Sequence, residues 1–233
     1  MQMSSPNQTM SSFQSPKALA ELAFWESRVR QHGVLANDHY EHIYTSHFGL
    51  TETFYRDKRV LDIGCGPRGS LEWAADALCV GADPLAMAYR RLGTAHHAMH
   101  YVACGAEALP FDDGSFDVVS AFNSLDHVDD LAAAAAEISR VVAPGGVFLL
   151  LVAIHEQPTT LEPSACDWDV VDRFRPALAL LEQRHIEYTV FSAEGYGDIY
   201  QSLRRGRAFD HRNPAERYGI LSAKFSRIGS SST

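Results

Sequence analysis

The chain of 233 residues contains no hydrophobic run long enough to cross a bilayer. Its longest apolar run, residues 146–154, is about half of the roughly 20 residues that a membrane-spanning helix needs. Residues 1–16, which are mainly Ser, Gln, Asn, Pro and Met, lack the charged and apolar regions of a secretory signal. We therefore expect a cytoplasmic protein that does not insert into membranes.

Cysteines are few, and a basic surface is lacking. Cys65, Cys79, Cys104 and Cys166 show no CxxC spacing and lie in apolar segments, which indicates reduced thiols rather than a disulfide framework or a zinc site. The 29 acidic residues outnumber the 20 Lys and Arg residues, and the formal net charge is −9. Such a charge repels polyanions, so we expect no nucleic-acid partner.

The composition that remains is that of a globular domain, with 46% hydrophobic and 21% charged residues. We expect one domain over residues 17–228, formed by a helical cap (17–54) and a Rossmann-like core (55–228). Residues 1–16 and 229–233 are expected to be disordered tails, because they cannot bury enough apolar surface to offset the entropy lost on ordering.

Short apolar segments alternate with helical segments through the core. This alternation predicts an α/β fold with a doubly wound, mostly parallel sheet of seven strands, because parallel strands need crossover helices. Two late strands with no obvious helix between them favour an antiparallel C-terminal edge. The expected strands are residues 59–63, 78–82, 100–103, 116–121, 146–154, 178–189 and 220–228. The expected helices begin at Ser70 and Pro84 and cover residues 129–142 and 167–174.

A glycine-rich loop follows the first expected strand. Gly64, Gly66 and Gly69 in the string VLDIGCGPRGS satisfy the pattern G-x-G-x-x-G. Glycines permit a tight turn and a close approach of the backbone to a ligand, and the helix expected after them offers free N–H groups. The pattern alone fits a dinucleotide as well as S-adenosylmethionine (SAM).

Two acidic residues flank this loop. Asp83 closes the second expected strand, roughly 20 residues further on, where a carboxylate can accept both ribose hydroxyls of an adenosine. Asp62 lies two residues before the first glycine. A charge there disfavours a pyrophosphate and favours the ammonium and sulfonium groups of SAM. The other role open to Asp62 is structural, as a buried carboxylate bonded to loop amides.

The chain resembles the class I SAM-dependent methyltransferases of the small-molecule, ubiquinone-biosynthesis-like kind (methyltransferase type 11). Four strings in the same order carry the resemblance: VLDIGCGPRGS, VGADPLA, AEALPFDDGSFDVVSAFNSLDHVDD and RVVAPGGVFLLLV. The resemblance covers residues 59–152 and implies SAM as cofactor and methyl transfer to a small molecule by in-line displacement. It weakens after Gly66, where Arg68 either pairs with the SAM carboxylate or is solvated.

The resemblance also implies which residues hold the cofactor. They surround the methionine portion, accept the ribose hydroxyls, face the adenine and lie beneath the sulfonium. The expected residues are Asp62, Gly64 and Gly66 at the methionine portion, Asp83 at the ribose, Leu85, Ala106 and Glu107 beside the adenine, Asn123 and Ser124 beneath the sulfonium, and Cys65 and Pro84 as neighbours in the same loops.

The acceptor is expected beyond the carboxyl ends of the strands, near residues 123–127 and 155–156, as for ligands of open α/β sheets. Methyl transfer mainly requires that the acceptor is aligned, and a base is needed only if the acceptor carries a proton. His127 and His155 are the candidate general bases. The alternative for each is a structural histidine that is bonded to nearby backbone or to a carboxylate.

Aromatic and basic residues outside the motifs supply the candidates for acceptor binding. Tyr40 and Tyr44 are four residues apart on one helical face. They belong to a lid over SAM or pack the cap onto the sheet. Tyr196, Tyr200 and Arg204 are the best ligand candidates of a late polar segment, and the alternative for its arginines is a solvated loop.

A metal site is not expected, because His39, His42 and His47 have no partnering cysteine or acidic triad near them in the sequence. Two other functions stay open. The complete G-x-G-x-x-G pattern fits an NAD(P)-dependent oxidoreductase, and a methyltransferase-like fold can also bind SAM without turnover.

Overall fold

The computed structural model describes residues 15–33, 35, 40–155, 157–159, 161–175, 177–189, 198–213 and 218–228. The strands are β1 (Arg59–Ile63), β2 (Leu78–Ala82), β3 (His100–Val102), β4 (Phe116–Phe122), β5 (Val142–Ile154), β6 (Ala179–Glu187) and β7 (Gly219–Ser226). The α-helices are α1 (Pro16–His32), α2 (Glu41–Tyr44), α3 (Glu52–Tyr55), α4 (Ala86–Tyr89), α5 (Leu131–Val141) and α6 (Ile199–Arg205). The 3₁₀ helices are η2 (Ser46–Phe48), η3 (Arg90–Leu92), η4 (Thr94–His96), η5 (Leu125–His127) and η6 (Trp168–Arg173).

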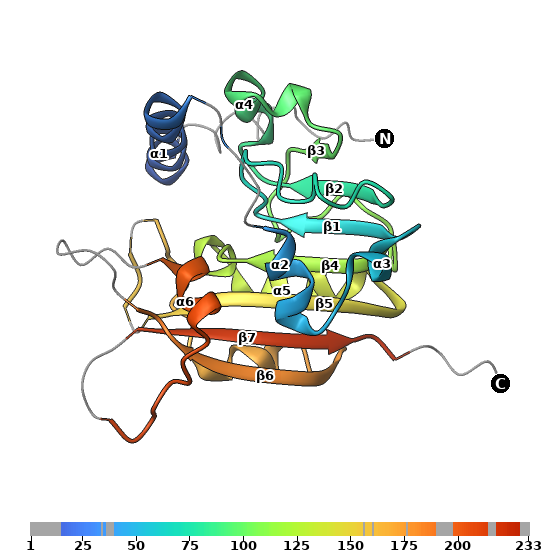
Figure 1. Ribbon diagram of the computed structural model, residues 1–233, viewed down its shortest axis with the longest axis vertical. Helices are drawn as coiled ribbons and strands as arrows, with labels where there is room; N and C mark the ends of the chain where they lie inside the picture. Colours follow the sequence, from blue (N-terminus) through green and yellow to red (C-terminus); the bar gives the residue numbers. More distant parts are fainter. Residues whose placement is uncertain are drawn as a thin grey trace, which may run out of the picture.

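The seven strands form one sheet in the order β3-β2-β1-β4-β5-β7-β6. The pairs from β3 to β5 are parallel, and β7 is antiparallel to both β5 and β6. In Figure 1 the arrowheads of β1 and β4 point left, whereas that of β7 points right. The predicted Rossmann-like sheet with an antiparallel C-terminal edge is confirmed.

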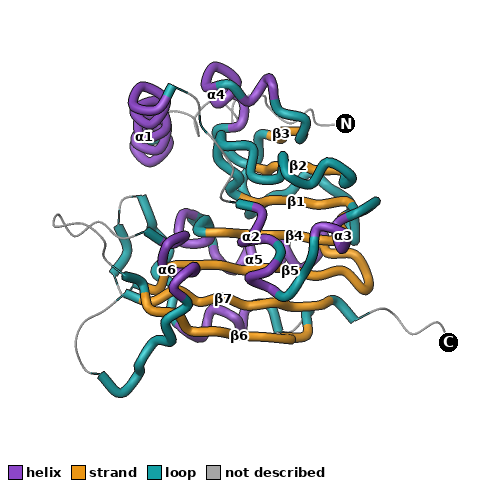
Figure 2. Tube along the Cα trace, viewed as in Figure 1, coloured by secondary structure: helices purple, strands orange, loops and turns teal. Residues whose placement is uncertain are grey.

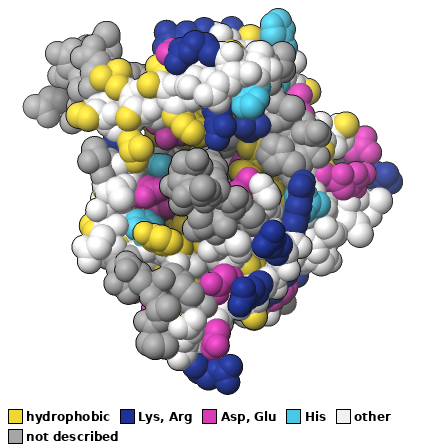
Figure 3. Space-filling model, turned by 60° about the vertical axis from the view of Figure 1, so that its left-hand side comes forward, with side chains coloured by type: hydrophobic (Ala, Val, Ile, Leu, Met, Phe, Trp, Pro, Cys, Tyr) yellow, Lys and Arg dark blue, Asp and Glu magenta, His cyan; other side chains and the backbone are white. Residues whose placement is uncertain are grey.

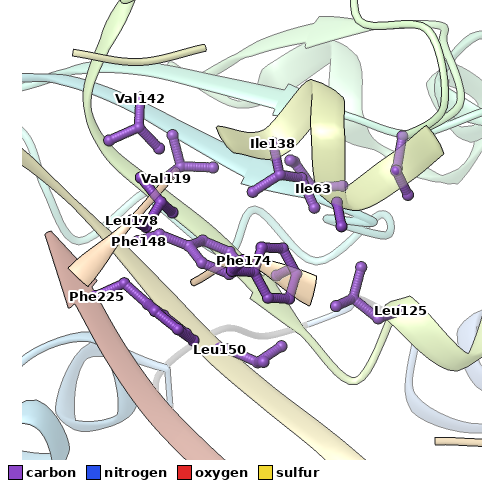
Figure 4. Close-up of a cluster of buried hydrophobic side chains, with 14 of the residues drawn as sticks. Ile63, Val119, Leu125, Ile138, Val142, Phe148, Leu150, Phe174, Leu178 and Phe225 are labelled. Atoms are coloured by element: carbon purple, nitrogen blue, oxygen red, sulfur yellow. The ribbon is translucent and has the colours of Figure 1, made fainter. Parts of the chain in front are cut away.

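Each face of the sheet packs against its own layer of helices (Figure 2). On one face, Phe148 of β5 packs with Phe174 and Phe225, with ring centroids 4.8 and 5.6 Å away, in the cluster that α5 covers (Figure 4). Leu149, the next residue, belongs to the cluster on the other face, together with Tyr44 of α2. Successive side chains of a strand point to opposite faces, so a strand that is buried on both reads as a continuous apolar run.

The chain between β1 and β2 differs from expectation, because residues 70–77 form turns and the helix predicted from Ser70 is absent. The Glu72 carboxylate accepts hydrogen bonds from the backbone of Ala98 and Met99, at 2.9 and 2.8 Å. The Trp73 ring packs against Tyr55, with centroids 4.9 Å apart. These long-range contacts fix the segment as turns, so the glycine loop is not followed by free helical N–H groups.

The helix α6, between β6 and β7, was also not predicted. It is seven residues long and begins after Asp198, whose carboxylate accepts from the backbone N–H of Gln201 at 3.0 Å. It ends at Gly206 in the left-handed conformation, with φ of +59°. An N-cap and a C-terminal glycine of this kind are helix signals, but seven residues are too few to show a hydrophobic period.

The N-terminal helix α1 lies to one side of the sheet (Figure 1). It begins at Pro16, the last residue of the expected tail, and the Ser15 hydroxyl accepts from the backbone N–H of Ala18 at 3.1 Å. Every residue of α1 is at least partly exposed. Lys17 anchors the helix by donating to the carbonyl oxygen of His127 at 2.8 Å and to Asp129 at 2.6 Å. Among the described residues, no helix combines the length and apolar character needed to span a membrane.

Candidate functional site

A cavity of about 1480 Å³ lies at the carboxyl ends of β1, β2 and β4, beneath α1. Ligands of open α/β sheets bind at such an edge. The cavity brings together residues that the sequence predicted for the cofactor and for the acceptor. Those that line it are Asp62, Gly64, Cys65, Gly66, Asp83, Pro84, Leu85, Ala106, Glu107, Asn123, Ser124, His127, Tyr40, Tyr44, Tyr200 and Arg204. His155 does not line it, and His39, Glu156 and Tyr196 lie outside the described residues.

The backbone of the glycine loop approaches two other segments closely. Gly64 has φ of +68°, and a Cβ atom on it would lie 2.3 Å from the Cβ of Ser124. Ser124 in turn donates from its hydroxyl to the carbonyl oxygen of Ile63 at 2.9 Å. Gly66 has φ of +58°, and its Cβ would lie 3.2 Å from the Trp25 ring of α1. Glycine is therefore required at 64 by both conformation and space.

Asp83 is a buried carboxylate that the glycine loop holds in place. One oxygen accepts from the backbone N–H of Gly66 at 3.1 Å and the other from that of Leu85 at 2.8 Å. A carboxylate has about four acceptor positions, so Asp83 keeps capacity for a further donor in the cavity. Burial raises the pKa of Asp83 to about 6, although the two backbone hydrogen bonds oppose the shift.

Asp62 is only 2% exposed and is satisfied within the protein. Its oxygens accept hydrogen bonds from the hydroxyls of Tyr44 at 2.9 Å, Ser120 at 2.7 Å and Ser70. Burial raises the pKa of Asp62, and these three hydroxyls oppose the rise. The structural partners of this carboxylate are therefore hydroxyl groups rather than loop amides, and they tie the end of β1 to α2 and β4.

The apolar part of the cavity lies beyond Asp83. The side chains of Leu85 and Ala106 are 5% and 7% exposed and line the cavity. Glu107, their neighbour, accepts from the backbone N–H of Asp129 at 2.8 Å and so fixes the loop that precedes α5. A planar heterocycle fits between apolar side chains of this kind, with the Glu107 carboxylate at its edge.

The end of β4 contains a strained residue. Asn123 has φ of +52°, a left-handed conformation that Asn tolerates better than most residues, and its N–H donates to the carbonyl oxygen of Leu151 at 2.7 Å. Its side chain is exposed in the cavity. Such strain persists where surrounding structure enforces it, and it is common at ligand sites.

The other side of the cavity is built from tyrosines and arginines on helices. The hydroxyls of Tyr40 and Tyr200 lie 3.4 Å apart, and burial raises the pKa of both above the ordinary value for tyrosine. Tyr40 precedes α2 rather than lying within it. Sequence reasoning missed Trp25 as a cavity residue. Its ring forms a cation–π contact at 5.6 Å with Arg68, for which the sequence left open a role at the SAM carboxylate or in solvent. Nothing in the local sequence links them, because the contact joins α1 to the glycine loop.

The two candidate bases face one buried carboxylate. The Nε2 atoms of His127 and His155 lie 3.9 and 3.8 Å from the two oxygens of Asp126, beyond hydrogen-bonding distance. The Nδ1 atom of His155 lies 3.0 Å from the carbonyl oxygen of Gln157. Since His127 alone of the two lines the cavity, it is the better placed to reach an acceptor, whereas His155 lies behind Asp126.

Charge on the visible surface is mixed. In Figure 3, acidic and basic side chains are interspersed over the face that is turned forward. Within the cavity, acidic residues such as Asp83 and Glu107 line the part near the sheet, and Arg28, Arg204 and Arg205 belong to the helices around it.

Comparison with known proteins identifies the family. A family profile described as "Methyltransferase domain" matches residues 61–150. The chain is 34% identical to the chloroplastic tocopherol O-methyltransferase of Arabidopsis thaliana, over 48% of this chain but only 35% of that protein. It is 31% identical to the malonyl-[acyl-carrier protein] O-methyltransferase of Erwinia billingiae, over 72% of this chain and 71% of that enzyme.

The fold is also that of solved methyltransferases. The N-methyltransferase NodS from Bradyrhizobium japonicum superposes with a TM-score of 0.57, covering 82% of this chain and 98% of that one at 17% identity. A likeness at that identity shows the fold alone. The sequence match to the Erwinia billingiae enzyme, with the matched domain, shows more: the chain belongs to the class I SAM-dependent methyltransferases of the small-molecule type.

Proposed function

We propose that this protein transfers the methyl group of SAM to a small-molecule metabolite. The observation that carries the proposal is the loop around Asp83, where Gly66 and Leu85 hold a buried carboxylate open to the cavity. Family membership supports SAM over a nicotinamide dinucleotide. The buried carboxylate of Asp62 at the start of the loop also disfavours a pyrophosphate there.

The residues of the cavity fit SAM. Gly64 and Gly66 line the cavity with backbone alone, which permits the close approach that the methionine portion needs. Asp83 can accept the ribose hydroxyls through its remaining acceptor positions, and Leu85 with Ala106 can cover the adenine. SAM supplies a methyl group on a positively charged sulfur, which is ready for displacement by an acceptor atom.

The protein's own contribution is to align the acceptor with that methyl group and to exclude water. The cavity of about 1480 Å³ exceeds the roughly 300–1,000 Å³ of most ligand pockets, which leaves space for an acceptor beside the cofactor. We place the acceptor between His127 and the pair of Tyr40 and Tyr200, with Arg204 at the margin. His127 is the candidate to take a proton from an acceptor that carries one.

Calorimetric titration of the whole chain with S-adenosylhomocysteine (SAH) and with NADH tests the cofactor. We expect one SAH site per chain and no NADH binding. The Asp83→Asn variant loses the charged acceptor of the ribose hydroxyls and should bind SAH at least about 30-fold more weakly, equivalent to about 2 kcal/mol. Asp112→Asn, which removes an exposed carboxylate outside the cavity, is the matched control. Tight NADH binding without SAH binding would refute the proposal.

A further inference from the structure

Three potential metal ligands meet at the wall of the cavity. Asp126 and His127 belong to η5, which follows β4, and Glu162 belongs to the loop after β5. One ligand atom from each lies within 4.8 Å of the others. His127 and Glu162 line the cavity, whereas Asp126 lies behind them in the protein.

The second feature of the cluster is the burial of the Asp126 carboxylate without hydrogen bonds to its oxygens in the described residues. Its side chain is 1% exposed, and neither oxygen has a hydrogen-bond partner within the described part of the chain. The Nε2 atom of His155, which faces it at 3.8 Å, is likewise buried and without such a partner. Buried polar groups are normally paired, because an unpaired charge loses its hydration without compensation. Asp126 and its neighbours therefore have the character of a site prepared for a cation.

The three segments of the cluster are fixed to one another by hydrogen bonds. Ser164 donates from its N–H to the carbonyl oxygen of Asp126 at 3.1 Å and from its hydroxyl to that of Val128 at 2.8 Å. The N–H of His155 donates to the carbonyl oxygen of Cys166 at 3.3 Å. The backbone around the cluster is thus preorganised, and adjustment is left to the half-buried side chains of His127 and Glu162.

We propose that Asp126, His127 and Glu162 form a binding site for one divalent cation. Ligand atoms about 2.1 Å from a common ion lie roughly 3–4 Å apart. The 3.9 Å between Asp126 and His127 satisfies this spacing, and Glu162 needs only a small side-chain shift. One imidazole and two carboxylates suit Zn²⁺, Mn²⁺ or Fe²⁺ better than the all-oxygen sites of Mg²⁺ and Ca²⁺.

The position of the site gives the cation a role. The protein supplies three ligands, and the side of the cluster that faces the cavity is open for a further ligand. An oxygen atom of the acceptor, from a hydroxyl or a carboxylate, can occupy that position and be held beside the methyl donor. This role rests on the proposed function, whereas binding of the cation itself does not. The site could not be predicted from the sequence, because Glu162 lies 35 residues after His127.

Titration of the chelator-treated whole chain with Mn²⁺, followed by electron paramagnetic resonance, tests the site. Mn²⁺ is the probe because it disfavours the thiolates of the free cysteines. We expect one bound ion per chain, with affinity reduced at least tenfold in Glu162→Gln and in His127→Gln. His100→Gln and Asp112→Asn, which change exposed residues outside the cluster, should bind as the parent does. No binding, or binding that the two cluster variants leave unchanged, would overturn the proposal.

Thermal unfolding of Asp126→Asn gives an independent measurement. Without metal, removal of a buried carboxylate that accepts no hydrogen bond in the described residues should raise the midpoint of unfolding by a few degrees. Mn²⁺, which should raise the midpoint of the parent chain, should not raise that of the variant. A lower midpoint together with a preserved Mn²⁺ effect would overturn the proposal. SAH titration of the same metal-free samples separates the two proposals, because SAH binding without Mn²⁺ binding contradicts the cation site alone.

Discussion

The buried carboxylates on the two sides of the cavity differ in the hydrogen bonds that they accept. On the side formed by β1 and β2, Asp62 accepts from three hydroxyls and Asp83 from two backbone N–H groups. On the side formed by the loop after β4, both oxygens of Asp126 are without a hydrogen-bond partner in the described residues. The carboxylates of the first side have their hydrogen-bond partners within the protein, whereas the proposed cation would supply the missing partner of Asp126.

This difference explains why one side can be assigned in detail. A site that is held by local hydrogen bonds and glycine conformations keeps its shape whatever the acceptor, so it suits a cofactor that every reaction shares. The other side is assembled from α1, α2, α6 and two loops, and many of its cavity side chains, such as His127 and Arg204, are exposed or half-buried. Substrate choice is expected to reside there, because loops and covering helices vary without disturbing the sheet.

The largest effect is expected at Gly64, where an alanine would meet Ser124. A left-handed conformation costs a residue with a Cβ about 1–2 kcal/mol, and overpacking adds about 1–3 kcal/mol. Gly64→Ala should therefore lower the free energy of unfolding by about 2–5 kcal/mol in urea and abolish SAH binding. Gly49→Ala is the control, because its φ of +65° is similar and no atom lies within 4 Å of the added Cβ. Equal losses in both variants would show that the contact with Ser124 does not matter.

The next-largest effect is expected from the hydrogen bonds that the Asp62 carboxylate accepts. Tyr44→Phe removes one of its three hydroxyl donors and should destabilise the protein by about 1.5–3 kcal/mol, because the acceptor is a buried carboxylate. Tyr55→Phe is the matched variant, since its hydroxyl donates instead to the neutral carbonyl oxygen of Tyr44. That loss should be about 0.5–1.5 kcal/mol. Urea unfolding measures both, and a smaller loss for Tyr44→Phe would contradict a charged Asp62.

The pH dependence of SAH binding sharpens the role of Asp83. Because its pKa is raised to about 6, the free protein holds this group ionised above pH 6 and protonated below it. The ionised form accepts the ribose hydroxyls, so the dissociation constant of SAH should be constant above pH 6. Below pH 6 it should rise about tenfold per unit, or about 1.4 kcal/mol. In calorimetry, Asp83→Asn should lose this dependence, and a flat profile for the unmodified chain would exclude Asp83 as a charged ligand.

The smallest effect is expected on the acceptor side. Tyr200→Phe removes the 3.4 Å contact between the Tyr200 and Tyr40 hydroxyls but keeps the ring packing. The variant should raise the KM of the acceptor a few-fold, corresponding to about 0.5–1 kcal/mol, and leave SAH affinity within about twofold. Steady-state kinetics and SAH titration together check this. A large loss of SAH affinity would place Tyr200 on the cofactor side instead.

Much of the fold could be predicted because the central strands are marked by local sequence. β1 and β2 coincide with the expected residues 59–63 and 78–82. β5 begins at Val142, earlier than the expected residue 146, because Gly145 with φ of +77° bends the strand without ending it. The helix predicted from Ser70 was wrong, since Glu72 bonds to a distant backbone that no local pattern reveals.

The candidate site could likewise be predicted only in part. Asp62, Gly64 and Asp83 lie in motifs of a few residues, and the structure brings them to one cavity, although their contacts with SAM remain predictions. The surroundings of Asp126 could not be predicted, because His155 and Glu162 reach it from segments about 30 residues further along the chain. Short sequence motifs therefore predict the cofactor side of the cavity, whereas the acceptor side depends on contacts between distant segments.

The most direct test of methyl transfer is to incubate the chain with SAM that carries an isotopically labelled methyl group and a metabolite extract. Mass spectrometry then follows labelled products and SAH. We expect a labelled small molecule and SAH in equal amounts, both greatly reduced with Asp83→Asn and unchanged with Asp112→Asn. SAH binding by calorimetry without any labelled product or SAH formation from SAM, in extracts with added Mn²⁺ as well as without, would contradict turnover and indicate a protein that binds the cofactor without catalysis.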